Sequence, residues 1–351
     1  MNLSSNPIRV PPIISERTID ILNGTLFDWI HPKLARYNKK LKESTRLVDL
    51  INETDLTFRY IKKESHPYTI QEYMDEFNGE MISIEWLIYW EILDKYFSSY
   101  LMDKRKQPMF NTLHLNEDGH TILSLNHYIS KHNLAWEWYG QGDQSIIKTN
   151  RKKWLDIECI NSANIRLLMH KFENKPLNFY TSRLAILGTG GNFITNCELT
   201  NKTTPVISIL YLLSIVFNNL YIHVPTVATS TTYIVGVNYR GITTNNLKKI
   251  LDWFNDIEDD VIERMSIFKR TDIPPEFIDN VVGIIKKITE LHIKINNRSL
   301  MLYNEYKDKD IKCIVSDMEE IRKNNCKYWT SKYHLFKLDE SKEIIRNQIK
   351  L

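Results

Sequence analysis

The sequence predicts an α/β protein built on a mainly parallel sheet, with helical regions before and after it. Residues 110–139 alternate like a strand, break at a polar turn, continue with helical spacing and end in a second strand. This order is that of a βαβ unit. Residues 204–238 contain one apolar helix followed by two strands, and the chain from residue 243 onward has helical spacing. We therefore expect a mostly helical N-terminal region (1–81), a sheet domain (82–241) and a helical C-terminal extension (242–351).

Length and composition indicate a soluble globular protein of one large or two modest domains. The chain has 351 residues, of which 42% are hydrophobic and 25% are charged. The net charge of +3 is too small to identify a nucleic-acid-binding protein by itself. Short basic clusters are expected to be solvated surface: Lys39-Lys40, Lys104-Arg105-Lys106, Arg151-Lys152-Lys153 and Lys248-Lys249.

Cysteine spacing and hydropathy argue against a metal, a disulfide framework or a membrane segment. The four cysteines are far apart and form no C-x-x-C pair, which favours a reducing intracellular setting. Residues 1–12 lack a charged segment followed by an apolar run, so we expect no signal peptide, and their three prolines predict a loose leader. The apolar stretch 206–217 is too short to span a bilayer and is expected to be a buried helix.

The predicted elements of the sheet domain follow in order along the chain. Residues 82–96 are expected to form an amphipathic helix, because Trp86, Trp90 and Leu93 recur at helical spacing. The next predicted elements are a strand at 110–115, a helix at 121–130, a strand at 135–139, a strand at 184–187, a turn at 189–191 and a strand at 192–197.

The end of the sheet domain is predicted to be one helix and two strands. Thr204 can cap a helix whose first residue is Pro205, and Asn218-Asn219 is expected to end that helix after Phe217. The strands are expected at 220–224 and 231–238.

The C-terminal extension contains a long helix that begins near Pro274-Pro275-Glu276, with Asp272 or Thr271 as its cap. Its apolar residues form a seam with a three-to-four alternation: Phe277, Val281, Ile284, Ile288, Leu291, Ile295 and Leu302. Packing within the chain is the simpler interpretation. We expect Phe277 and Val281 to dock on the sheet domain and residues 291–302 to be available to a partner.

Three groups of residues, all within 86–241, carry a resemblance to a known family. The first comprises Leu113–His120, Leu123–Tyr128 and Ala135–Trp138; the second is Gly190–Ile194; the third comprises Leu210–Leu213, Leu220–Ile222, Pro225 and Thr232–Gly236. The first group is similar to L-x-L-C-E-A-P-G-G-F, L-N-H-Y and W-x-W. The second is similar to K-G-G-x-F-V-x-K. The third is similar to L-Y-L-L, V-Y-I-x-K-P and S-E-x-Y-I-V. These motifs are those of the FtsJ superfamily of cap-ribose RNA 2′-O-methyltransferases, including the forms of large DNA viruses. The resemblance implies a class I, Rossmann-like methyltransferase fold.

The resemblance also implies a catalytic Lys-Asp-Lys-Glu tetrad, which this sequence lacks. In the family one lysine is the general base, and the neighbouring cation depresses its pKa. The four matching positions hold Ile88, Ser182, Asn196 and Thr231. None of these side chains is a base with a tuned pKa, so we expect a catalytically inactive member.

The loop that would bind S-adenosylmethionine is also altered. The family has a Pro-Gly-Gly turn that lets the backbone approach the cofactor, whereas Glu117, Asp118 and Gly119 retain a single glycine. Asp118 could face the sulfonium and Asp143 could contact a ribose, but a solvated acidic turn is the simpler interpretation. We expect no cofactor, or S-adenosylmethionine if the chain is active.

Other polar and aromatic residues are expected to be structural. His114, His120, His127 and His132 are close in sequence, but strand and helix geometry should separate them. Trp136 and Trp138 are expected to belong to the core rather than to a cap-stacking platform.

The expected function is that of an inactive cap 2′-O-methyltransferase homologue. It would act as a non-catalytic subunit or scaffold in viral mRNA capping or transcription, in the host cytoplasm or the virion. Its expected partner is a capping or transcription enzyme subunit, and RNA is left open as a second partner. One alternative is an active enzyme with misaligned motifs, in which Arg183 or Lys202 replaces a lysine and Glu198 an acid. A second alternative is a structural virion protein derived from a methyltransferase.

Overall fold

The structure is a computed structural model of the chain. It describes residues 8–10, 25–26, 32–64, 76–98, 110–117, 119–131, 136–142, 147, 165–170, 184–197, 199, 203–227, 231–255, 265–266, 268 and 270–345.

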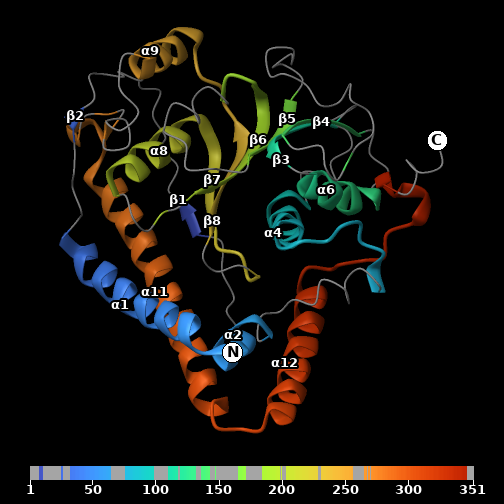
Figure 1. The fold of residues 1–351 in the computed structure, drawn as a ribbon. Coiled ribbons are helices and arrows are strands. Elements are labelled where there is room, and N and C mark those ends of the chain that lie inside the picture. The colour runs from blue at the N-terminus through green and yellow to red at the C-terminus, as the bar shows by residue number, and fades with distance from the viewer. Residues whose placement is uncertain are drawn as a thin grey trace.

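The described strands form a seven-stranded sheet in the order β1-β7-β8-β6-β5-β3-β4 (Figure 1). The strands are β1 (Ile8–Val10), β3 (Phe110–Glu117), β4 (Trp136–Gly142), β5 (Ile165–His170), β6 (Leu187–Cys197), β7 (Phe217–His223) and β8 (Thr232–Tyr239). Strands β4, β3, β5 and β6 are parallel neighbours, whereas β8 is antiparallel to both β6 and β7. A parallel sheet that ends with an antiparallel strand between its last two parallel ones is the class I methyltransferase arrangement, so the predicted fold is confirmed.

The described helices lie before, between and after these strands. They are α1 (Pro32–Thr54), α2 (Leu56–Glu64), α4 (Ile84–Ile92), the π-helical turn η1 (Leu93–Phe97), α6 (His120–Ser130), α8 (Thr203–Val216), α9 (Thr244–Asn255), α11 (Pro275–Tyr306) and α12 (Ile311–Lys332). Two short 3-10 turns, η6 (Arg270–Asp272) and η7 (Glu340–Lys342), and a small two-stranded sheet of β2 (Thr25–Leu26) and β9 (Met265–Ser266) complete the described elements. Among the described helices, none combines the length and the apolar character that crossing a bilayer requires.

Alternation along the strands sends side chains into two cores, one on each face of the sheet. In β6, Phe193 belongs to the core formed with α8 and α11, and its neighbour Ile194 belongs to the core formed with α4, α6 and the end of α12. Figure 1 shows α8 and α11 on one side of the sheet and α4 and α6 on the other. The molecule is therefore a three-layer helix–sheet–helix structure.

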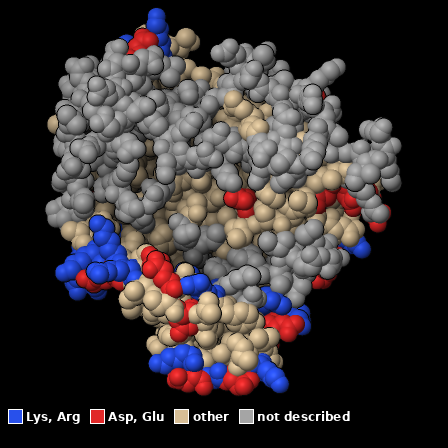
Figure 2. Space-filling model, in the orientation of Figure 1, with Lys and Arg blue, Asp and Glu red and all other residues tan. Residues whose placement is uncertain are grey.

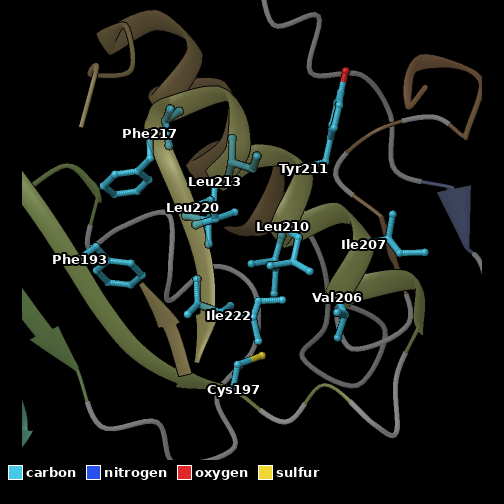
Figure 3. Close-up of a cluster of buried hydrophobic side chains, with 14 of the residues drawn as sticks. Phe193, Cys197, Val206, Ile207, Leu210, Tyr211, Leu213, Phe217, Leu220 and Ile222 are labelled. Carbon is cyan, nitrogen blue, oxygen red and sulfur yellow. The ribbon is translucent and has the colours of Figure 1, made fainter. Parts of the chain in front are cut away.

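Aromatic and aliphatic side chains fill the core beneath α8 (Figure 3). The Phe193 and Phe217 rings are stacked with centroids 6.2 Å apart, and Leu210 and Leu213 of α8 are fully buried. Gly236 lies opposite Phe193 in the register, and a Cβ added there would come within 2.9 Å of the Phe217 ring. Close packing of the ring therefore requires the glycine.

Three residues of the N-terminal leader form a strand, which was not predicted. Residues 8–10 form β1, which pairs antiparallel with β7 from Ile8 opposite Ile222 to Val10 opposite Leu220. An edge strand tolerates the flanking prolines because only one side of it donates to the sheet.

The glycine turn at 189–191 lies inside a strand rather than between two strands. Strand β6 begins at Leu187, and the register with β5 jumps from Ile165 opposite Leu187 to Leu167 opposite Asn192. Gly190, with φ of 79°, is in the extra segment. The predicted strand break is therefore an extended bulge that keeps β6 continuous.

Two helix boundaries also differ from the prediction. Helix α8 begins at Thr203, one residue before the predicted cap, and β7 begins immediately after it, so Asn218-Asn219 belongs to the strand. Pairing of Asn219 with Val237 of β8 outweighs the preference of asparagine for turns. Helix α11 has Pro274 at its N-cap with no side-chain hydrogen bond, because Thr271 and Asp272 lie in η6.

Helix α4 is buried on all sides and is not amphipathic. Every residue from Trp86 to Ile92 is buried. Its inner side faces the sheet, and its outer side is covered by the segment after α12, where the Trp90 indole donates to the Tyr333 carbonyl at 2.8 Å. Sequence periodicity could not reveal this second covering layer.

Most of the α11 seam packs within the chain. Phe277, Val281 and Ile284 are buried in the α8-side core, and Leu291 packs against the same core. At the far end, Leu302 packs against the small cluster of Ile61, Tyr306, Ile314 and Met318. The expectation that residues 291–302 are left for a partner is therefore wrong for Leu291 and Leu302.

Charging the seam should unfold the protein. We expect the double variant Ile284→Asp with Ile288→Asp to lose more than about 3 kcal/mol of unfolding free energy, because each buried side chain contributes about 1.5–3 kcal/mol. Urea denaturation monitored by tryptophan fluorescence measures this. Met301→Asp on the same helix is the control, since Met301 is 72% exposed. A double variant as stable as this control would show that the seam does not hold the fold.

Candidate functional site

The topology defines one edge of the sheet as the expected ligand crevice. From β3 the chain proceeds outward to β4, whereas β5 and β6 lie on the other side of β3, so the strand order reverses between β3 and β5. Ligands of open α/β sheets bind at the carboxyl ends of the strands at such a reversal. Here those ends are Glu117 of β3 and His170 of β5.

A glycine turn follows β3 at this edge. Gly119 is the N-cap of α6, with φ of 115° and ψ of −13°, a conformation that side-chain-bearing residues avoid. His120 lies with its Nδ1 2.8 Å from the carbonyl of Met81, ahead of α4. Asp118 and Asp143 lie outside the described residues, as does the Glu117 side chain. The described part of the loop thus has one glycine turn at the edge where a ligand is expected.

Two of the four tetrad positions lie close to Tyr233 of β8 along the sheet. Asn196 lies directly opposite Tyr233 in the β6–β8 register, and Thr231 precedes it by two residues. Ile88 is buried in α4, and the ring of the adjacent Tyr89 meets the Tyr233 ring edge-on at 5.9 Å. The alignment therefore places these positions in one region, and the three described side chains there are not ionisable. Ser182 lies outside the described residues, as do Arg183, Glu198 and Lys202.

The described histidines of the 114–127 segment do not converge. The His114 ring lies between two threonine hydroxyls, with Nε2 3.0 Å from Thr112 Oγ1 and Nδ1 2.7 Å from Thr121 Oγ1. Burial lowers the pKa of His114 to about 3. His127 lies 2.7 Å from the Phe336 carbonyl, and burial lowers its pKa to about 4. These histidines are structural, as predicted, and His132 lies outside the described residues.

The tryptophans of β4 support the core instead of an open platform. Trp138 is buried, and Trp136 packs partly buried against the same core. The Trp136 indole donates to the Thr112 hydroxyl at 3.1 Å, which holds its edge against β3.

Sequence analysis missed a buried carboxylate that joins four segments. Glu91 of α4 is fully buried, and its Oε2 lies 3.2 Å from Nε2 of His223 at the end of β7. The same oxygen accepts the Thr226 N–H at 2.9 Å, and Oε1 accepts the Trp329 indole of α12 at 2.7 Å. Glu91, His223, Thr226 and Trp329 are called the Glu91 network below.

Tyrosines and lysines surround the Glu91 network. Tyr96 Oη lies 3.4 Å from His223 Nδ1, and the Tyr333 hydroxyl lies 2.7 Å from Thr226 Oγ1. Burial lowers the pKa of His223, although Glu91 acts in the opposite direction. A neutral His223 that donates from Nε2 to the carboxylate satisfies both groups.

No local motif could have indicated this network, because its members come from distant parts of the chain. One signal was present: Glu91 is the acid in the otherwise apolar run Trp86–Leu93. An acid that the helical pattern buries must find donors. The network lies beside β7, four strands from β3 in the sheet order, or about 19 Å at about 4.8 Å per strand. It adjoins the region of the tetrad positions, because His223 lies opposite Tyr233 in the β7–β8 register.

Comparisons with known proteins give partial structural similarity. A scan of protein-family models and a search of curated proteins find no match to the chain. Among solved structures, the chain is similar to a probable spermidine synthase from Corynebacterium glutamicum ATCC 13032, with 12% identity and a TM-score of 0.34, over 50% of this chain and 71% of that one. Human methyltransferase-like protein 13 in complex with SAH gives 14% identity and a TM-score of 0.29, over 50% and 92% of the two chains. The CMeT domain of the citrinin polyketide synthase gives 12% and 0.27, over 37% and 47%. At these TM-scores the likenesses carry no argument, and the fold assignment rests on strand order and direction.

The buried histidines should make stability fall in mild acid. The unfolded chain binds a proton at each histidine below about pH 6.5, whereas folded His127 and His114 resist protonation down to about pH 4 and 3. Each therefore contributes stability that is lost as pH falls, with a slope of about 1.4 kcal/mol per pH unit between pH 6 and 4.5.

Urea denaturation at several pH values tests this expectation. His127→Gln should reduce the slope of unfolding free energy against pH by the contribution of about one proton. Equal slopes for the wild type and His127→Gln would show that His127 titrates normally in the folded protein.

Proposed function

We propose that this chain is a non-catalytic methyltransferase-like subunit that acts by binding a catalytic partner in mRNA capping or transcription. The observation that carries the proposal is the chemistry of the three described tetrad positions. In the FtsJ resemblance, the positions of Ile88, Asn196 and Thr231 hold a lysine base, a second cation and an acid.

None of these three side chains can activate a ribose hydroxyl. A general base must accept a proton near neutral pH. The Ile88 side chain has no lone pair to accept one, and an amide or an alcohol is protonated only in strong acid. Since Ile88 is 2% exposed, a solvent ion could not readily act in its place.

One described lysine, Lys95, has a strongly lowered pKa. Burial, followed by the charge of Lys332, lowers the pKa of Lys95 to about 8, which would suit a general base. Lys95 lies near His223, which is opposite Tyr233 in the β7–β8 register. In the proposal Lys95 is not the catalytic base, because it occupies none of the four tetrad positions.

The helical extension supports a role in protein binding. Large apolar side chains are exposed where α1 meets α2 and where α11 meets α12: Leu50, Leu56, Met301 and Ile311, with exposed fractions of 56%, 75%, 72% and 58%. Figure 2 shows non-charged surface at this end of the molecule, with Lys, Arg, Asp and Glu at its margin. Apolar surface bordered by charge is typical of protein-binding sites.

An assay of methyl transfer tests the proposal. The purified chain, incubated with labelled S-adenosylmethionine and cap-0 RNA, should give no product above a protein-free control, because no described tetrad side chain is a base. A stoichiometric product that disappears in the Asn196→Ala variant would contradict the proposal. Recovery of a capping enzyme or polymerase with the tagged chain from its native cells would distinguish a subunit from a structural virion protein.

A further inference from the structure

The chain after α12 is held on the outer face of α4 and α6 largely through its own backbone. His127 of α6 donates from Nε2 to the Phe336 carbonyl over 2.7 Å, and the Asn126 amide donates to the Lys342 carbonyl at 2.8 Å. These contacts recognise main-chain atoms and not side chains. We call residues 334–345 the C-terminal strap.

The segment before α4 also binds backbone atoms of the strap. The Leu338 N–H donates to the Phe77 carbonyl at 2.9 Å. The Glu80 carboxylate accepts the N–H groups of Ile344 and Ile345 at 2.8 and 2.6 Å. These two residues begin a helical turn, so no preceding turn supplies acceptors for their N–H groups. A carboxylate from another part of the chain therefore fixes the far end of the strap.

A few apolar side chains complete the hold. Leu335 and Leu338 are buried, whereas Lys337 between them is exposed. The Phe336 ring lies 5.4 Å from the Trp90 ring of α4. Main-chain hydrogen bonds combined with pockets for a few side chains are the way in which proteins bind extended peptides. The strap is thus bound to α4 and α6 as a tethered peptide would be.

The strap is joined to α12 through a strained residue. Helix α12 ends in a Schellman motif, in which the Leu335 N–H donates to the Thr330 carbonyl at 3.1 Å and His334 has φ of 50°. This left-handed conformation is unfavourable for a residue with a side chain. Rotation of His334 into the right-handed region would continue α12 and lift the strap, while the Glu91 network holds Trp329 in place.

The strap leaves two polar atoms of the covered face unsatisfied. Within the part of the chain that the structure describes, the buried Trp86 Nε1 and His127 Nδ1 have no hydrogen-bond partner. The two rings meet edge-on with centroids 5.4 Å apart. Because His127 donates from Nε2, its Nδ1 is an acceptor, and Trp86 Nε1 is a donor. Buried groups without partners cost stability, so an occupant that satisfied them would bind better than the strap.

We propose that the outer face of α4 and α6 binds an extended segment of the catalytic partner, and that the C-terminal strap is the tethered competitor of that segment. The inference rests on the proposed subunit role and gives it a contact apart from the exposed apolar end of the helical extension. The contacts define the segment: two apolar residues three positions apart, as at 335 and 338, and the first turn of a helix six positions further on, as at 344.

Fluorescence anisotropy with a labelled synthetic peptide of residues 334–345 and the full chain tests the competition. Leu338→Asp in the chain should raise the affinity for the wild-type peptide at least about tenfold, because the tethered strap loses a buried side chain. Lys337→Asp in the chain is the control and should change the affinity less than about twofold, because Lys337 is exposed. A peptide that carries Leu338→Asp should not bind.

The hinge gives a second test that leaves the covered face unchanged. His334→Gly relieves the left-handed strain and should favour the closed strap, whereas His334→Val increases the strain and should favour the open one. Both variants lose the contact of His334 with Asp94, so their comparison isolates the backbone effect. The peptide should bind the valine variant about tenfold more tightly than the glycine variant, the ratio that about 1.4 kcal/mol gives.

The partner is tested with the same peptide. An excess of it should displace the capping enzyme or polymerase that the tagged chain recovers from its native cells. Recovery that the peptide leaves unchanged would overturn the proposal, as would equal peptide affinities of the wild type, Leu338→Asp and Lys337→Asp. Light scattering that shows a wild-type dimer, lost in Leu338→Asp, would assign the face to the strap of a second copy instead.

The outcomes are separable from those of the proposed function. Melting temperatures of all variants verify that the fold is intact. The anisotropy assay contains no methyl donor, RNA or partner protein, so its failure removes this docking face and leaves the subunit proposal standing. Methyl transfer by the chain would remove the subunit proposal and leave the competition between strap and peptide as measured.

Discussion

The buried carboxylate of Glu91 is the interaction on which the arrangement of one whole face of the sheet depends. Removing a carboxylate from water costs several kcal/mol unless donors replace the lost hydration. Here the donors are the Thr226 N–H in the turn after β7 and the Trp329 indole of α12. His223 of β7 lies 3.2 Å from the same carboxylate through its Nε2. Because Glu91 is satisfied only when α4, β7 and α12 are all in place, the C-terminal helix is part of the sheet domain's core and not a detachable appendage.

This constraint also concerns the proposed absence of catalysis. Helix α4 lies between the sheet and the segment that follows α12, which covers it through the bond from Trp90 to the Tyr333 carbonyl. A helix enclosed on both sides favours apolar residues such as Ile88 and disfavours a lysine that must reach a substrate. We infer that the absence of the tetrad lysine from α4 is linked to the covering of this helix. The sheet has the class I methyltransferase arrangement, but the chain's own C-terminal segment covers α4.

Local sequence patterns were sufficient to predict most of the sheet domain, because period-two and helical spacing are properties of single segments. Such patterns predicted the strand at Phe110 and helix α6. They also predicted the order of one helix and two strands at the end of the sheet domain. The Glu91 network could not, since His223 and Trp329 become its neighbours only in the folded chain. The continuous strand through Gly190 was missed because the pairing of β5 with β6 overrides a turn preference. The candidate site was predicted by resemblance; of its positions, Asn196 lies opposite Tyr233 in the β6–β8 register, and Thr231 precedes Tyr233 by two residues.

The central claim is that the fold of a methyltransferase remains without its function, and cofactor binding tests it most directly. The melting temperature of the purified chain should be measured across increasing concentrations of S-adenosylmethionine, with S-adenosylhomocysteine in parallel. A ligand present at a hundred times its dissociation constant would add about 2.7 kcal/mol of stability, which gives an easily measured increase. The account predicts no concentration-dependent change with either compound. A saturable increase, abolished by Gly119→Val at the turn after β3, would show that this edge still holds the cofactor and would contradict it.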